Sequence, residues 1–200
     1  VVKLDRRADP ANWPGGVRRL MREQYLRAPL DEVFPFFADA HNLEAITPAV
    51  LRFNVLTPKP IEMGVGARIE YKLSLRGFPM KWRTQIVAWE PGVRFVDLQV
   101  KGPYRRWHHE HTFQQVGDGT LCRDIVHYSH WGTALGERLL VRPDIEGIFD
   151  YRYAEMAKLF GGWVPDEPVR GGGSARPATA CADSVCRWRF VLLILRGRPA

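Results

Sequence analysis

The sequence predicts an α+β fold in which an antiparallel sheet of about seven strands packs against one long C-terminal helix, with two short helices after the first strand. Three observations support this. Nearly every segment between residues 51 and 130 has strand character, and glycine and proline stand at the junctions between these segments. After them, apolar side chains recur at intervals near 3.6 residues, which is typical of a helix. A strand meander has one face to cover, and this helix can cover it.

The predicted elements begin with a strand over Arg18–Ala28, where the side chains alternate between two faces. A short helix is expected over Leu30–Asp39, with Pro29 near its first turn, where a missing N–H costs little. Pro35 is expected to kink or split this helix, because proline removes a hydrogen bond and clashes with the preceding turn. Another helical turn or two is expected over residues 42–47.

Six further strands follow, each separated from the next by a short turn-forming segment. The predicted ranges are Arg52–Leu56, Ala67–Leu75, Met80–Trp89, Arg94–Val100, Arg105–Val116 and Thr120–Ser129. Connections of this length favour hairpins between neighbouring strands, so the whole series is expected to form an antiparallel meander.

The last predicted hairpin turns at Gly117-Asp118-Gly119. If Gly117 pairs with Thr120, Phe113 faces Asp124, His111 faces Val126 and His109 faces Tyr128. One face of the hairpin then carries Trp107, His109, His111, Phe113, Asp124, Val126 and Tyr128. Large aromatic side chains mixed with a few titratable ones are typical of a pocket wall.

A helix is predicted over Ala134–Phe160, interrupted at Pro143, so that its main segment starts at Asp144 and ends before Gly161 and Gly162. Its apolar stripe is expected to consist of Leu135, Leu139, Ile145, Phe149, Tyr153, Met156 and Phe160.

Length and composition indicate one domain with tails. The chain has 200 residues, of which 46% are hydrophobic. We expect an irregular lead over residues 1–17, a folded domain over 18–163 and a disordered basic tail over 164–200. Within that tail, Trp188–Leu195 is a candidate partner-binding segment, although a segment without a selected role is equally compatible with it.

Charge and cysteine content exclude several classes of protein. From residue 165 onward there are six arginines and three acidic residues, which leaves 23 basic and 19 acidic residues, or +4, in the rest of the chain. This mild and scattered charge gives no support to nucleic-acid binding. Three cysteines form no disulfide framework, so a cytoplasmic location is expected. No apolar run approaches the roughly 20 residues of a membrane span. No nucleotide-binding glycine motif is present, and no cofactor is expected.

Three stretches resemble a known superfamily: residues 33–48 (VFPFFADAHNLEAITP), Trp89-Glu90-Pro91, and residues 102–113 (GPYRRWHHEHTF). With the order of elements, they are similar to the helix-grip fold of the START and birch-pollen-allergen superfamily, SRPBCC, over about Arg18–Phe160. They look like its bacterial ligand-binding branch, related to polyketide cyclase/dehydrase and coenzyme Q-binding proteins. Pro35 departs from the pattern. The resemblance implies a curved sheet wrapped around the long helix, with a cavity between them for a lipid, quinone or polyketide-like molecule.

On that fold, ligand-binding side chains are expected from several strands and from the helix: Tyr71, Trp82, Thr84, Phe95, Asp97, Gln99, Trp107, His109, His111, Phe113, Tyr128 and Phe149. The strand that carries Asp97 is ambiguous. Val96, Leu98 and Val100 form its more apolar phase, which would turn Asp97 and Gln99 to solvent. Phe95 and the family pattern favour the opposite choice.

The candidate catalytic residues are His109, His111 and Asp124, because a carboxylate beside an imidazole can raise its pKa and provide a general acid or base. The same groups could instead bind a ligand or form a buried polar network that fixes the sheet. A metal site is not expected: His109-x-His111 is a ligand spacing, but the residue four positions after His111 is Gln115 and no further histidine motif follows.

Two functions remain. The first is non-catalytic binding of an apolar small molecule. The second is a cyclase or dehydratase in which an imidazole moves protons while Tyr128 stabilises an enolate oxygen. The sequence does not indicate the ligand or the oligomeric state.

Overall fold

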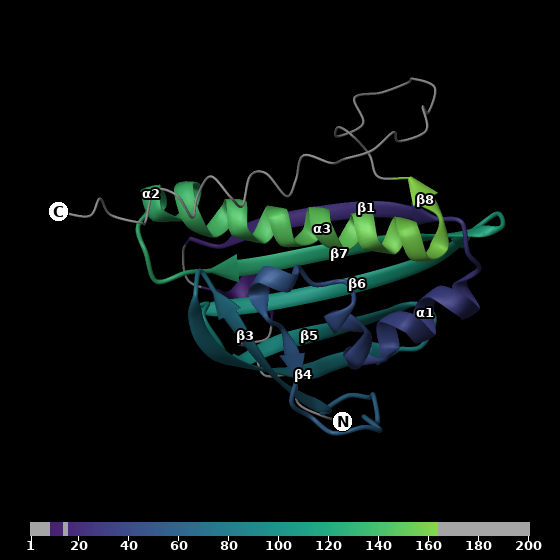
Figure 1. Ribbon diagram of the computed structural model, residues 1–200, viewed down its shortest axis with the longest axis horizontal. Coiled ribbons are helices and arrows are strands. Elements are labelled where there is room, and N and C mark those ends of the chain that lie inside the picture. The colour runs from purple at the N-terminus through teal and green to yellow at the C-terminus, as the bar shows by residue number, and fades with distance from the viewer. Residues whose placement is uncertain (1–8, 14–15, 164–200) are drawn as a thin grey trace, which may run out of the picture.

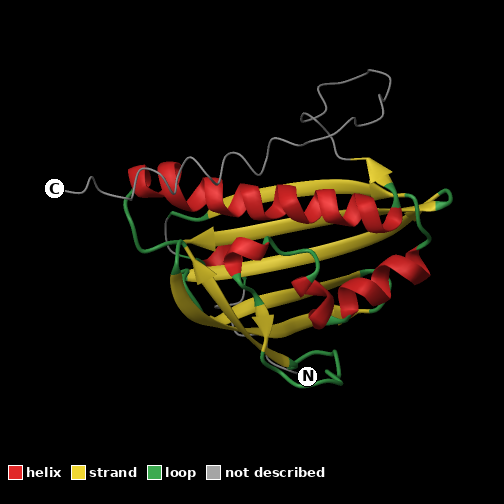
Figure 2. Ribbon diagram, in the orientation of Figure 1, coloured by secondary structure: helices red, strands yellow, loops and turns green. Residues whose placement is uncertain are grey.

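The protein forms one curved antiparallel sheet with a long helix along one face, as Figures 1 and 2 show. The structure is a computed structural model and describes residues 9–13 and 16–163. In the sheet the strand order is β2-β3-β4-β5-β6-β7-β1-β8. The predicted fold class is therefore confirmed. The predicted tail over 164–200, with its Trp188–Leu195 segment, lies outside the described residues.

The strands agree closely with the predicted ones. They are β1 (Arg18–Leu26), β2 (Asn54–Val55), β3 (Arg68–Leu75), β4 (Phe78–Glu90), β5 (Arg94–Lys101), β6 (Arg106–Val116), β7 (Gly119–Ser129) and β8 (Gly162–Trp163). The predicted strand over Arg52–Leu56 shrinks to two residues, because Arg52 has a φ of 45° and closes the short helix Ala49–Leu51. Strand β8 was not expected; it pairs with the end of β1.

The pairing of β6 with β7 differs by two residues from the prediction. Val116 pairs with Gly119 across a two-residue turn, and Gly117 takes a φ of 57°, which suits a glycine. As a result His111 lies opposite Asp124 and His109 opposite Val126. A shift of two residues leaves every side chain on its predicted face.

Helix α1 (Leu30–Ala38) runs through Pro35 without a break, so the expected split is wrong. Pro35 lies on the exposed side of the helix, together with Asp31, whose carbonyl loses its partner and can be hydrated there. Two short 3-10 helices follow, Ala40–Glu44 and Ala49–Leu51. Asp39 caps the first of them by accepting a hydrogen bond from His41 N at 2.9 Å.

The C-terminal helix consists of α2 (Ala134–Gly136), a π-helical segment Glu137–Val141, and α3 (Arg142–Phe160). Within α3, Ile145, Phe149, Tyr153 and Met156 are buried as predicted. The prediction is wrong for Leu135 and Leu139, which are 65% and 59% exposed. The π-helical segment explains this, because its wider turn breaks the 3.6-residue period from which they were assigned to the stripe.

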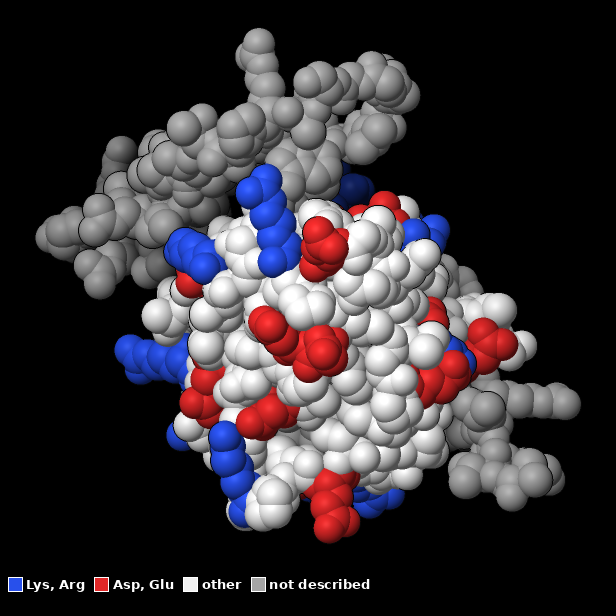
Figure 3. Space-filling view, turned by 90° about the vertical axis from the view of Figure 1, so that its right-hand side faces the viewer, with Lys and Arg blue, Asp and Glu red and all other residues white. Residues whose placement is uncertain are grey.

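The core lies between the sheet and the helices in two clusters. One surrounds Phe34 and joins α1 to the inner face of the sheet, and the other joins Trp107 and Tyr128 to Ile145 and Phe149 of α3. No helix in the part of the chain that the structure describes is long and apolar enough to cross a membrane. On the face shown in Figure 3, acidic and basic side chains are interspersed, and those of the described residues form no continuous basic surface there.

Candidate functional site

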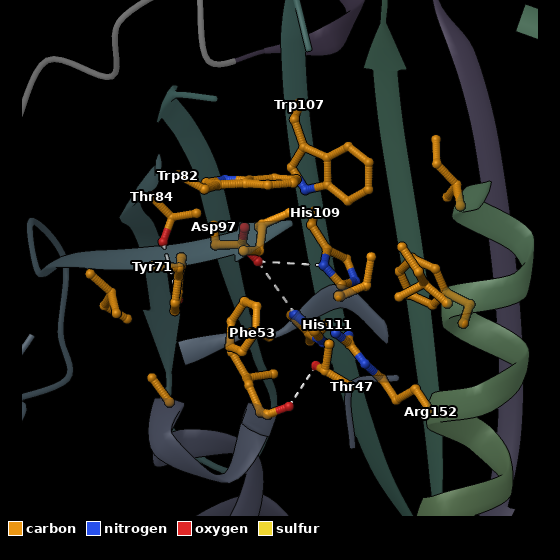
Figure 4. A pocket seen from close by; sticks show the side chains of 18 of the residues that line it. Thr47, Phe53, Tyr71, Trp82, Thr84, Asp97, Trp107, His109, His111 and Arg152 are labelled. Atoms are coloured by element: carbon orange, nitrogen blue, oxygen red, sulfur yellow. Dashed lines mark hydrogen bonds and ion pairs between the residues drawn. The ribbon is translucent and has the colours of Figure 1, made fainter. Parts of the chain in front are cut away.

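A pocket of about 150 Å³ lies between the sheet and α3 and is partly open to solvent. Its walls are the inward-facing side chains of β3 to β6, the inner face of α3, and the short helices that follow β1. Most of the lining is apolar or aromatic, and Figure 4 shows the polar side chains that interrupt it. They are Thr47, Thr84, Asp97, His109, His111 and Arg152.

Nine of the twelve predicted ligand-binding residues line this pocket: Tyr71, Trp82, Thr84, Phe95, Asp97, Trp107, His109, His111 and Phe149. Eight of them lie on strands and share one face of the sheet because strand side chains alternate, and Phe149 lies on α3. The ambiguous strand β5 turns Phe95 and Asp97 toward the pocket, in the phase favoured above, while Val100 is exposed. Whether these residues bind a ligand stays a prediction.

The other three predicted residues do not line the pocket, and each has a different partner. Gln99 bonds to the backbone of Tyr104, donating to its carbonyl oxygen at 2.7 Å. Phe113 is packed edge-on against Phe34 in the core. Tyr128 donates its hydroxyl to Glu137 Oε1 at 2.9 Å, away from the pocket.

Helix α3 contributes pocket residues that were not predicted, namely Ile145, Ile148 and Arg152. They stand at positions i, i+3 and i+7, so the helical period that indicated Phe149 also indicates them. Arginine was left out of the predicted stripe because the stripe was assigned from apolar residues alone. Other unpredicted lining residues come from loops and short helices, among them Phe53, Met63 and Tyr104.

Two carboxylates hold the two imidazoles of β6 between them. On the pocket side, Asp97 Oδ2 lies 3.5 Å from His109 Nδ1 and 3.4 Å from His111 Nε2. On the far side, Asp124 Oδ1 lies 3.0 Å from His109 Nε2 and 2.7 Å from His111 Nδ1. Tyr153 donates its hydroxyl to Asp124 Oδ2 at 2.9 Å. Asp124 therefore lies behind the imidazoles, outside the pocket wall.

The charges in this cluster follow from burial and from these contacts. Burial, and then the neighbouring His111, lower the pKa of His109 to about 4. Burial also works against a charge on His111, yet Asp124 and Asp97 together raise the pKa of His111 above its ordinary value. Burial opposes the charge of Asp124 as well, but both imidazoles hold the pKa of Asp124 well below its ordinary value. The two carboxylates thus favour a proton on His111, whereas burial favours the neutral form of His109.

These contacts determine which imidazole could exchange a proton with a substrate. Both nitrogens of each imidazole already face a carboxylate within 3.5 Å. Tyr128, which was predicted to stabilise an enolate, is bound to Glu137 instead. A general base needs a free lone pair within reach of the substrate proton. Neutral His109 can donate from only one nitrogen, so its other nitrogen keeps a lone pair, and His109 stays the candidate general base of the two imidazoles.

One group of residues has the composition of a metal site. Ligand atoms of Asp97, His109 and His111 lie within 4.8 Å of one another, and His and carboxylate ligands suit zinc or a similar divalent ion. The carboxylate comes from β5, a neighbouring strand, so spacing along β6 could not indicate it. The absence of a bound metal stays a prediction.

Two donors on the pocket wall have no acceptor among the described residues. They are Trp82 Nε1 and Arg152 Nε, and both are buried. Tyr71, by contrast, lies within hydrogen-bond distance of Thr84, with the two side-chain oxygens 3.4 Å apart. A ligand that carries oxygen atoms could satisfy the two donors.

Solved structures of proteins from several organisms share this architecture. Major latex-like protein 151 from Panax ginseng is 15% identical, with a TM-score of 0.57 over 74% of this chain and 99% of that protein. TTHA0849 from Thermus thermophilus is 18% identical, with a TM-score of 0.55 over 71% and 99%. Ms6760 from Mycobacterium smegmatis is 15% identical, with a TM-score of 0.54 over 72% and 96%. Identities this low establish the shared fold alone.

The comparison with curated protein sequences gives no match. The family model for polyketide cyclase/dehydrase and lipid transport proteins matches residues 26–150, more than half of the chain. Together with the helix-grip architecture, this match shows that the chain belongs to the polyketide cyclase/dehydrase and lipid transport family of the SRPBCC superfamily.

Proposed function

We propose that the protein binds an apolar small molecule, of lipid, quinone or polyketide type, in the pocket between the sheet and α3, without transforming it. The observation that carries this proposal is the composition of the pocket wall. Aromatic and aliphatic side chains from four strands and the helix surround the pocket, and polar groups are few. Such a wall suits an apolar molecule with a small number of oxygen atoms.

The size of the pocket limits the part of the ligand that it encloses. A dry apolar cavity of about 150 Å³ holds a molecule of roughly benzene size, whereas most ligand sites measure about 300–1,000 Å³. A lipid or quinone would therefore extend through the open side or displace flexible lining side chains. Met63 and Phe53, which come from loop segments, are among the residues that line the pocket.

A catalytic role as a cyclase or dehydratase has weaker support. It needs an imidazole that can exchange a proton with the substrate, and each imidazole nitrogen lies within 3.5 Å of a carboxylate. The family name includes carriers as well as enzymes and so does not decide between the two functions.

The proposal is tested by titrating the protein with 1-aminoanthracene, a neutral apolar fluorophore whose emission rises in an apolar site. We expect saturable binding to the wild type. Ile148→Trp fills the pocket from α3 and should weaken binding by about tenfold or more, since overpacked sites lose their ligand space. Leu159→Trp is the matched control, because Leu159 lies on the same helix and is 54% exposed.

Absence of saturable binding to the wild type would contradict the proposal, and so would equal binding to the wild type and Ile148→Trp. Mass spectrometry of native protein from its own host provides a second measurement. A co-purifying apolar molecule is expected, and it should be lost from Ile148→Trp and retained by Leu159→Trp.

A further inference from the structure

Arg152 lies on the inner face of α3, at a position where the periodicity of the helix predicts an apolar residue. Along the inner face of α3, the pocket is lined by Ile145, Ile148, Phe149 and Arg152, and one turn later Met156 is fully buried. Figure 4 shows the Arg152 side chain extending from the helix into the pocket. A guanidinium so placed is partly removed from water, and a charge in such surroundings needs a partner.

The chain itself provides no direct partner for this charge. Among residues 9–13 and 16–163, no carboxylate forms an ion pair with Arg152 and no acceptor forms a hydrogen bond with it; its Nε is buried without a partner. The guanidinium lies 5.1 Å from the ring centre of Phe149, a contact that accepts no N–H hydrogen bond of ordinary strength. The nearby Asp97 faces the two imidazoles at 3.4 and 3.5 Å.

Another arginine near the pocket shows how this chain holds a guanidinium when it supplies the partner. Arg76 donates from Nε and from a terminal nitrogen to the two oxygens of Asp144, at 2.8 and 2.9 Å. The planar guanidinium has five donors arranged for such a two-point contact with a carboxylate. In Arg152, the corresponding edge has no carboxylate.

We propose that Arg152 binds the carboxylate of a bound ligand, so that the ligand is an anionic amphiphile of fatty-acid type. This inference rests on the proposed function and adds the chemistry of the ligand's polar end. Arginine is suited to this role because it stays charged and its fork matches a carboxylate. A buried donor without an acceptor destabilises the protein. An oxygen atom of the ligand that accepts a hydrogen bond from it removes this cost.

The arrangement of the lining fits such a molecule. Figure 4 shows Arg152 and Thr47 at one end of the pocket, and Trp82 and Trp107 at the other. An alkyl chain would run from the guanidinium toward the two tryptophans, along Tyr71 and Phe149. Because most of the wall along the chain is apolar, we expect the length of the chain to matter less than the head group.

The experiment compares three ligands of the same chain length: decanoate, decan-1-ol and methyl decanoate. Each displaces 1-aminoanthracene at pH 8, where decanoate is ionised. For the wild type we expect decanoate to bind at least about tenfold more tightly than the alcohol or the ester. Arg152→Met removes the charge and keeps the length of the side chain, and should bring the ratio near one. Arg152→Gln is a second variant in case the first does not fold.

Arg142→Met is the matched control, since Arg142 lies on the same helix, is exposed and pairs with Glu146 at 2.9 Å. It should keep the full preference for decanoate. Equal affinity of the wild type for decanoate and decanol overturns the inference, as does a preference that survives in both Arg152 variants. Tighter binding of decyl phosphate than of decanoate would also overturn the assignment of a carboxylate. If 1-aminoanthracene itself does not bind, the proposed function fails; if it binds and decanoate has no advantage, only the present inference fails.

Discussion

Replacing Asp124 by alanine should destabilise the protein more than any change of similar size on its surface. The carboxylate is 3% exposed and receives three contacts, from Tyr153 at 2.9 Å, His109 at 3.0 Å and His111 at 2.7 Å. Each hydrogen bond to a buried charge contributes about 1.5–3 kcal/mol, but the three share one group and do not add. Loss of one partner from a buried ion pair costs about 3–5 kcal/mol, which is the decrease we expect in the free energy of unfolding.

The measurement is urea denaturation of the wild type and three variants, followed by circular dichroism. Asp124→Asn keeps the shape and loses the charge, so its cost should lie between those of the other two variants. Tyr153→Phe removes a single hydrogen bond and should cost about 1–1.5 kcal/mol. An Asp124→Ala variant within about 1 kcal/mol of the wild type, with an unchanged denaturant slope, would refute the view that this carboxylate holds β6, β7 and α3 together.

Two further predictions concern pH and the helix. The pKa of His111 is raised in the folded state, so its stabilising charge is fully present below the ordinary value of 6.5 and is lost as pH rises through the raised pKa. His111→Gln should therefore destabilise the protein more at pH 6 than at pH 9; equal losses in urea denaturation would contradict this. Met156→Ala should lower the free energy of unfolding by about 2–5 kcal/mol, and Leu135→Ala by less than about 0.5 kcal/mol, because only Met156 is buried. Thermal denaturation checks the pair, and similar losses would contradict the exposed position of Leu135.

From the sequence, the sheet face on which a side chain lies could be predicted more reliably than the residue that it contacts. A hairpin register wrong by two residues still placed His109 and His111 on the correct face, because strand side chains alternate with a period of two. Because of the same error, His111 was predicted to lie opposite Val126 and not opposite Asp124. Asp97 was assigned to the pocket face through Phe95 and the family pattern, against the more apolar opposite phase, and Val96 on that phase is in fact buried as well. In the C-terminal helix, Leu135 was misplaced because a π turn gives no signal in the apolar pattern.

The polar residues of the pocket have different roles because their partners differ. Asp97, His109 and His111 lie against one another and against Asp124, so we expect substitutions among them to change stability. Arg152 lines the same pocket but has no acceptor among the described residues. A polar group that the fold leaves unsatisfied lowers stability unless another molecule completes its contacts. Binding selectivity should therefore depend on Arg152, whereas stability should depend on the histidine cluster. Because the two groups lie on opposite sides of the pocket, on α3 and on the sheet, substitutions can separate these effects.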